Sequence, residues 1–206
     1  MNKYFKAFLV AIVLQTLMFT TMEFQLFQTR KDLNQLTQSV NSFDILNQKI
    51  ADYIIKVNPK VSADSARLIG DLTIKECNGD LRKISVALAI FHTESHFMHS
   101  SVSEKDAKGI GQNTAIAYEE YKLRTKRDDI DPKTLEGNIK LTIWGLDNIK
   151  TRYVKRNYPD GIYAFYNGGK AQYQRLVNGQ PIAKETKNYV IQVKERQSKL
   201  LTILRT

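Results

Sequence analysis

The chain of 206 residues contains a single cysteine, Cys77, and only four prolines. One thiol excludes an intrachain disulfide and any metal site built from several cysteines. No short sequence unit recurs, which excludes solenoid and propeller architectures. Acidic side chains are outnumbered by basic ones, 21 to 31, so the formal net charge is +10. This excess of positive charge indicates an anionic partner, such as a nucleic acid, a lipid surface or an acidic polymer.

The longest apolar run lies at the N-terminus and reads FKAFLVAIVLQTLMFTTM over residues 5–22. A helix of this length rises about 27 Å, close to the hydrocarbon thickness of a bilayer. Basic residues at its start favour a cytoplasmic N-terminus. We therefore expect an uncleaved signal anchor over residues 1–22, which makes the chain a single-pass cytoplasmic (inner) membrane protein with a periplasmic or other extracytoplasmic domain. A cleaved signal peptide is the alternative, although small residues in an A-x-A arrangement are missing from its end.

Residues 23–57 are expected to form a helical stalk. Apolar side chains recur there in alternating steps of three and four, which is typical of a coiled-coil seam with one polar residue that sets the register. The seam consists of Leu33, Leu36, Val40, Phe43, Asn47, Ile50, Ile54 and Val57. The alternative is an amphipathic helix packed on the next domain, because further apolar residues widen its face. The segment suggests two partners: a second copy, through residues 33–57, or an envelope-spanning complex.

Residues 58–206 have the composition and size of a domain with one core. Helical periodicity dominates and strand-like alternation is scarce, so we expect a mainly α fold with at most a minor hairpin. The expected helices cover residues 65–74, 81–91, 115–121, 135–153, 162–166, 171–176 and 186–204.

A carboxylate follows the apolar stripe of the segment LRKISVALAIFHTESHF, residues 81–97. Asp80 is the expected N-cap of this helix. Ile84, Ala87, Leu88 and Phe91 lie on one face, and Glu94 continues it. Burial disfavours the charged form of a carboxyl group, so we expect the pKa of Glu94 to rise toward that of a general acid. A half-exposed glutamate at a helix end is the alternative.

All three histidines, His92, His96 and His99, lie close to Glu94. A pair spaced like His92 and His96 can bind zinc on one helix face. The zinc-protease pattern, however, needs a glutamate directly after the first histidine, and Thr93 holds that position. We therefore expect no metal and no cofactor.

Three motifs follow Glu94-Ser95: SEKDAKGIGQNTA over 103–115, YAFYNGG over 163–169 and ETKNYV over 185–190. Each alone is weak. In this order they resemble the catalytic domain of the soluble lytic transglycosylase (SLT) family in the lysozyme-like superfamily. That family has a helix ending in Glu-Ser, a Ser-x-x-Gly-Ala-x-Gly-Leu-Met-Gln loop, an Ala-Tyr-Asn-Ala-Gly segment and Glu-Thr-x-x-Tyr-Val. The resemblance covers roughly residues 58–195, although the loop departs from the pattern at Asp106 and Gly111.

The resemblance implies a lysozyme-like fold and cleavage of the β-1,4 bond between N-acetylmuramic acid and N-acetylglucosamine in peptidoglycan, with a 1,6-anhydro product. Glu94 would act first as acid and then as base, because the substrate supplies the nucleophile. Tyr166 would orient Glu94, while Gln112 and Asn167 would hold sugar groups. Ser95 and Ser103 would line the cleft.

Two other functions remain open at this point. One is a goose-type-like muramidase that uses water, and the other is an inactive peptidoglycan-binding module of an envelope-spanning complex. Nucleic-acid binding is disfavoured, because the basic residues are dispersed and no binding motif is present. Peptidoglycan stems carry free carboxylates, which a cationic domain attracts over long distances.

Overall fold

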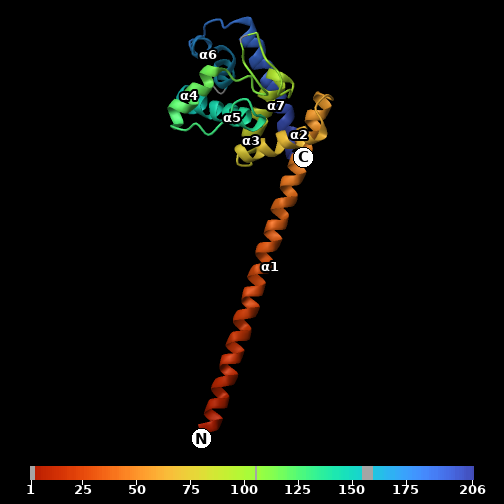
Figure 1. The fold of residues 1–206 in the computed structure, drawn as a ribbon, viewed down its shortest axis with the longest axis vertical. Coiled ribbons are helices and arrows are strands. Elements are labelled where there is room, and N and C mark those ends of the chain that lie inside the picture. Colours follow the sequence, from red (N-terminus) through yellow and green to blue (C-terminus); the bar gives the residue numbers. More distant parts are fainter. Residues whose placement is uncertain (1–2, 105, 155–159) are drawn as a thin grey trace. The chain divides into compact units, whose positions relative to one another are not determined.

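The computed structural model describes residues 3–104, 106–154 and 160–206, with side chains from residue 15 onward. Over these residues the chain forms seven α-helices and no strand, so the mainly α prediction is confirmed. Figure 1 shows the ribbon with these helices labelled. The helices are α1 (Lys3–Val57), α2 (Ala63–Glu76), α3 (Leu81–Ser95), α4 (Ala115–Thr125), α5 (Leu135–Arg152), α6 (Gly161–Val177) and α7 (Lys184–Arg205). Two compact units divide the chain, Met1–Ile45 and Leu46–Thr206.

The first unit is the N-terminal part of α1. Much of the expected membrane anchor, residues 5–14, lies outside the described side chains. Among the residues that are described, no helix combines the length and apolarity that a bilayer crossing requires. The anchor over residues 1–22 therefore stays a prediction.

The second unit begins at Leu46, whereas the sequence suggested a boundary at residue 58. The end of α1 belongs to the core of this unit: Ile50 and Ile54 are fully buried, and Asn47 is 5% exposed. The Asn47 amide donates a hydrogen bond to Asp71 on α2. These three residues were expected in the coiled-coil seam. Their burial against the chain's own helices means that the seam cannot extend through residues 33–57, and the packed-helix alternative holds for its second half.

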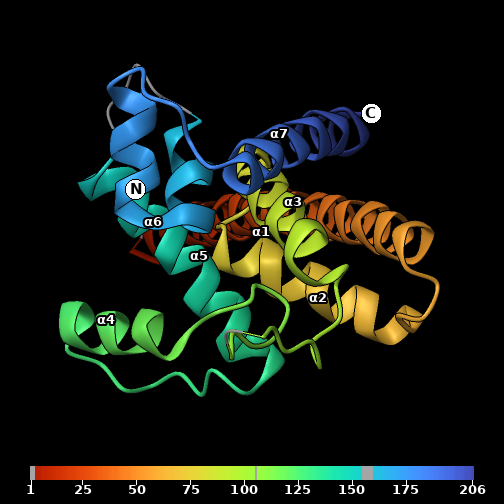
Figure 2. The ribbon, with the colours of Figure 1, turned by 90° about the horizontal axis from the view of Figure 1, so that it is seen from above.

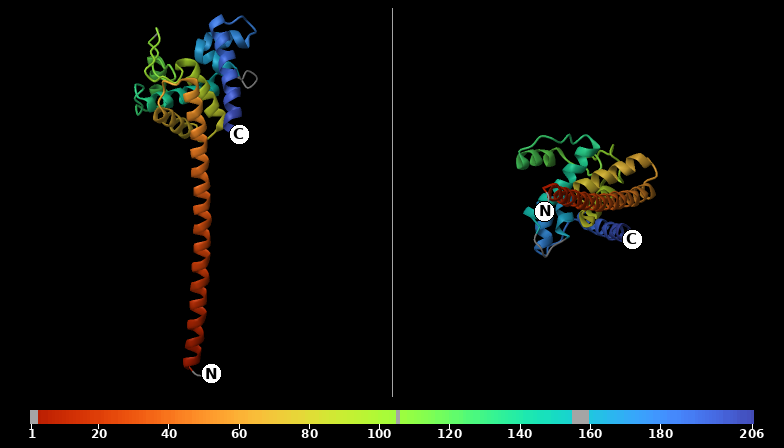
Figure 3. Two further views of the ribbon diagram at one scale, coloured as in Figure 1. Left: turned by 90° about the vertical axis from the view of Figure 1, so that its right-hand side faces the viewer. Right: turned by 90° about the horizontal axis from the view of Figure 1, so that it is seen from below.

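Helix α3 runs through the core of the second unit, where it packs chiefly against α7 (Figures 2 and 3). Its N-cap is Asp80, as predicted, whose carboxylate accepts the backbone N–H groups of Arg82 and Lys83. The residues from Ala87 to Phe91 are all buried. A stretch of helix that is apolar and buried on all sides is typical of a core position. The site is built around this helix.

The chain turns sharply where α3 ends. His96 and Phe97 both adopt left-handed backbone conformations, with φ of 50° and 65°. The Phe97 N–H donates back to the Phe91 carbonyl at 3.3 Å, so the turn folds back onto the last turn of the helix. Phe97 itself is 2% exposed, so its burial holds the turn. The helix therefore ends one residue after Glu94.

The loop after α3 is fastened to α5 by buried polar groups. Asn138 is fully buried; its Oδ1 accepts the Gly111 N–H at 2.9 Å, and its Nδ2 donates to the Lys108 carbonyl at 2.9 Å. A Cβ on Gly111 would come within 1.9 Å of the Thr142 hydroxyl. This close approach explains the glycine at 111, where the family pattern has methionine. The sequence allowed for a minor hairpin. In its place, the described residues have isolated antiparallel β-bridges at Lys108, which pairs with Val102 and with Asn113.

Helix α6 covers the two short helices expected at 162–166 and 171–176. Its backbone is not helical at Gly169, where φ is 70°. A residue with a side chain rarely adopts this conformation, so Gly169 permits the break. The helical run is thus interrupted between the two helices that the sequence predicted.

Candidate active site

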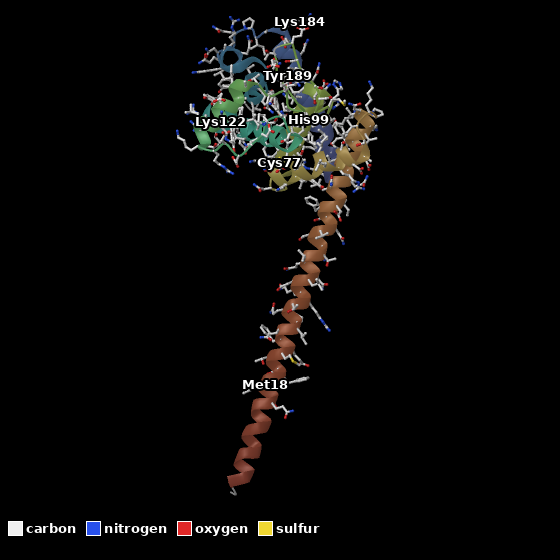
Figure 4. The ribbon with its side chains drawn as sticks, viewed as in Figure 1. Met18, Cys77, His99, Lys122, Lys184 and Tyr189 are labelled. Atoms are coloured by element: carbon white, nitrogen blue, oxygen red, sulfur yellow. The ribbon has the colours of Figure 1, made fainter. Side chains whose placement is uncertain are left out.

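Glu94 is half-buried in the last turn of α3, with its carboxyl group directed at α7. The Tyr189 hydroxyl of α7 donates a hydrogen bond of 2.5 Å to Glu94 Oε1. Tyr189 is 7% exposed and lies inside the helical unit (Figure 4). The two residues are 95 positions apart, so the packing of α3 on α7 creates the pair.

Burial raises the pKa of Glu94 from 4.5 to about 7, as the sequence analysis expected. The hydrogen bond from Tyr189 favours the carboxylate and lowers the pKa in part. The negative charge of Glu185 acts in the opposite direction and raises it. A carboxyl group with a pKa near neutrality can both donate and accept a proton at physiological pH, which is what acid–base catalysis requires.

Tyr166 on α6 does not make the contact expected of it. Its hydroxyl donates to the Gly111 carbonyl at 2.8 Å, so it ties α6 to the loop after α3. Burial raises the pKa of Tyr166 far above its usual value, and the nearby charge of Glu94 adds to that shift. Tyr166 therefore lies near Glu94, but Tyr189 is the tyrosine that orients the carboxyl group.

Ser95 was expected to line a cleft, yet it is only 8% exposed. Its hydroxyl donates to the Ile110 carbonyl at 2.8 Å and lies 3.2 Å from the Phe91 carbonyl. A hydroxyl held in this way has no hydrogen left for a ligand. Ser95 therefore fastens the loop after α3 to the end of this helix, directly beside Glu94.

Gln112 and Ser103 shape the same loop. The Gln112 amide donates to the carbonyls of Ser101 and Gly109, at 3.1 and 2.9 Å. The Ser103 hydroxyl accepts the Ala107 N–H at 3.1 Å, and Ser103 is exposed. Asn167 is half-buried on α6, next to Tyr166. The structure thus brings Glu94, Ser95, Gln112 and Tyr166 together around one loop.

Three residues that act on this site were missed by the sequence analysis as site residues: Tyr189, Glu185 and Asn138. The first two lie in the ETKNYV motif, and their separation of four places both on one face of a helix. That spacing was a usable signal that they act together. Asn138 lies outside every motif, and only its burial on α5 reveals that it holds the loop.

His92 lies on the other side of α3 from Glu94, because residues two apart point to opposite faces of a helix. The His96 ring packs beside that of His92, and the His99 ring is hydrogen-bonded to the Lys133 carbonyl at 2.9 Å. His92 Nδ1 and the Tyr53 hydroxyl of α1 are hydrogen-bonded at 2.7 Å. Burial lowers the pKa of His92 to about 4, and the charge of Arg196 adds to the shift, so the ring is neutral. Arg196 itself donates to the Thr93 hydroxyl at 2.6 Å. These contacts join α1, α3 and α7 behind Glu94.

A cavity of about 140 Å³ lies elsewhere, at the connection from α4 to α5. Its lining is mostly polar and includes Asp129, Asp131, Glu136 and Lys140. None of the residues around Glu94 contributes to it. The cavity is therefore separate from the candidate active site.

A helical domain that keeps one glutamic acid protonated near neutral pH is typical of lysozyme-like enzymes that cleave glycans. A family model described as the transglycosylase SLT domain matches residues 73–190, more than half of the chain. The chain therefore belongs to the SLT transglycosylase family, as its motifs indicated. Among curated proteins, none is detectably similar in sequence. Family membership indicates a domain that acts on peptidoglycan.

We predict that Glu94→Gln makes the protein more stable than the unaltered chain at pH 8 but not at pH 4. The folded-state pKa of about 7 exceeds the unfolded value of 4.5, so the folded state binds the proton more tightly. The bound proton stabilises the folded state fully below pH 4.5, and this stabilisation is lost as the pH rises through 7. A shift of this size corresponds to about 3 kcal/mol. Urea unfolding from pH 4 to 8 measures it, with Glu195→Gln as control, because Glu195 is an exposed glutamate of α7. Equal pH dependence of the Glu94→Gln and unaltered proteins contradicts the burial argument.

Replacing Tyr189 by phenylalanine should lower the rate of glycan cleavage by about 10- to 100-fold, the range by which a misplaced acid reduces catalysis. In the unaltered protein the hydrogen bond from Tyr189 lowers the pKa of Glu94. Its removal therefore raises this pKa and moves the alkaline limb of the pH–rate profile to higher pH. Tyr166→Phe is the matched control for the shift of the alkaline limb, because its hydroxyl bonds to Gly111 rather than to Glu94. A Tyr189→Phe profile whose alkaline limb stays in place argues against direct coupling.

Proposed function

We propose that the protein is a lytic transglycosylase that cleaves the bond between N-acetylmuramic acid and N-acetylglucosamine in peptidoglycan. The observation that carries the proposal is the state of Glu94, a half-buried carboxyl group with a pKa of about 7 and a hydroxyl that fixes its orientation. Membership in the SLT family supports the substrate class. The basic charge of the chain, +10, suits a polymer whose peptide stems carry carboxylates.

In the first step, protonated Glu94 donates its proton to the glycosidic oxygen, and the bond from that oxygen to muramic acid C1 breaks. The N-acetylglucosamine chain leaves as an alcohol, and positive charge develops at C1. Glu94, now a carboxylate, accepts the proton of the muramic acid C6 hydroxyl. The C6 oxygen bonds to C1 and closes the 1,6-anhydro ring. No water enters, and Glu94 ends the cycle protonated. One carboxyl group serves both steps because the substrate provides the nucleophile, whereas hydrolytic glycosidases use a pair.

A hydrolytic reaction is the second candidate, and Glu185 is the observation that favours it. Glu185 is exposed in the first turn of α7, and its charge raises the pKa of Glu94. A second carboxylate near the acid is what an enzyme needs to activate water on the other face of the sugar. In the transglycosylase reaction Glu185 has only an electrostatic role, because it helps to keep Glu94 protonated.

Mass spectrometry of digested peptidoglycan separates these candidates. We predict muropeptides that end in anhydromuramic acid, each lighter by one water than a reducing end. Glu94→Gln should abolish their release, because the amide cannot donate and recover the proton, while binding to sacculi is retained. Glu185→Gln should retain product identity and lose only activity at alkaline pH, because it removes one cause of the raised pKa.

Each of the other functions has its own outcome in this experiment. Reducing ends as the main product, together with inactivity of Glu185→Gln, would establish a hydrolase. Binding of the unaltered protein to sacculi without any release would establish a non-catalytic binding module. A binding assay with Glu94→Gln is the control for folding, because glutamine has nearly the size of glutamate and keeps an oxygen to accept the Tyr189 hydroxyl.

We further propose that residues 1–22 anchor the protein in the cytoplasmic membrane and that the domain from Leu46 onward acts outside the cytoplasm, where peptidoglycan lies. The run of apolar residues at 5–22 and the basic residues at its start support this. The full chain should remain with membranes after alkaline carbonate extraction, and a chain starting at residue 23 should be released. Release of both forms would contradict an anchor.

A further inference from the structure

The exposed part of α1 from Leu26 to Phe43 has an apolar stripe that no described side chain covers. Leu33, Leu36 and Val40 are 60, 62 and 51% exposed, and Leu26 and Phe43 are 52 and 38% exposed. These five residues, with Thr29, occupy the a and d positions of one continuous heptad register. We call them the α1 seam.

The width of the apolar face changes twice along α1. Before residue 28 the exposed apolar residues point in all directions, including Met18, Phe19, Phe24 and Phe27 (Figure 4 labels Met18). From residue 28 to 44 every apolar residue lies in the seam, and the other positions are polar. From Ile45 onward the apolar face widens again, and there α1 enters the core of the second unit at Leu46.

The width of the apolar face indicates which kind of surface can cover each part of α1. A helix packed on a globular core has a broad apolar face, as the buried residues after Leu46 do, whereas a stripe restricted to a and d positions is the narrow seam of a coiled coil. Residues 28–44 therefore do not match a broad globular groove or a bilayer. The partner that fits them is another helix with the same narrow stripe.

The residues that flank the seam allow this helix to be a second copy. In a parallel pair, each g position faces the e position of the next heptad on the partner. Self-pairing then sets Gln25 opposite Arg30, Asp32 opposite Thr37 and Ser39 opposite Asp44. No like charges face each other in this arrangement. These flanking positions also hold no cluster of charges of one sign, which would favour a different chain of opposite charge as the partner.

We propose that α1 forms a parallel, in-register coiled coil with a second copy of this chain through the α1 seam. The coil ends at Phe43, because the next residues of the register, Asn47, Ile50 and Ile54, are buried within their own chain. This limit corrects the longer seam expected from the sequence. The pairing does not depend on the proposed enzymatic activity.

Cysteine cross-linking of the full chain tests the pairing directly. Leu36→Cys places a thiol at a d position, where two copies of a parallel pair approach each other, and Gln38→Cys places one on the opposite side of the same helix. Under mild oxidation in membranes we expect a disulfide-linked dimer for Leu36→Cys. We expect only the background of the unaltered chain for Gln38→Cys. The native Cys77 sets that background, and it is 1% exposed.

A second substitution shows whether the seam itself holds the copies together. Adding Val40→Lys to Leu36→Cys places two like charges in the seam, so the cross-linked dimer should be lost, while adding Asn41→Lys on a polar position should leave it. The proposal is overturned if Leu36→Cys yields no dimer or if both cysteine positions cross-link equally. It is also overturned if Val40→Lys has no effect. All outcomes are read from mass on a gel, so a failure of the catalytic proposal would not change them.

Discussion

The contact between α3 and α7 is the constraint on which the candidate site depends. It brings Tyr189 against Glu94 and gives the carboxyl group a hydroxyl partner at 2.5 Å. It also withdraws the carboxyl group from water, which is the main cause of its raised pKa. A more exposed Glu94 would ionise well below neutral pH, and a site with more donors would stabilise the carboxylate further. The packing therefore leaves Glu94 with a pKa between these two limits.

The loop after α3 is the second part of this arrangement, and it is held from three sides. Ser95 ties it to α3 through the Ile110 carbonyl, Asn138 ties it to α5, and Tyr166 ties it to α6 through the Gly111 carbonyl. Buried polar groups that are all paired make such a network rigid, because the loss of any partner leaves a costly unpaired group. A rigid loop beside the carboxyl group suits the proposed reaction, in which C1 of the muramic acid has to be held within bonding distance of the C6 oxygen.

Much of this could be predicted from the sequence, and the limits have physical causes. The helices of the second unit follow from periodicity, and the cap at Asp80 and the burial of Glu94 follow from local patterns. The partner of Glu94 did not, because hydrogen-bond partners 95 residues apart depend on how helices pack. The same cause explains Ser95 and Tyr166, which the motifs identified as important but whose hydroxyls bond to backbone carbonyls. Sequence motifs show which residues meet at a site, whereas the individual contacts depend on packing geometry.

The boundary within α1 shows the same limit from another direction. A heptad register continues unbroken from Leu26 to Val57, so periodicity alone gives no reason to end the seam at any residue. What differs is the number of apolar positions per heptad, which rises at Ile45, just before the helix enters its own core. Asn47 illustrates the consequence: a polar residue in a heptad seam normally sets the register between two chains, but here its amide bonds to Asp71 of the same chain. One helix with one periodicity thus serves two different surfaces, and the width of its apolar face distinguishes them.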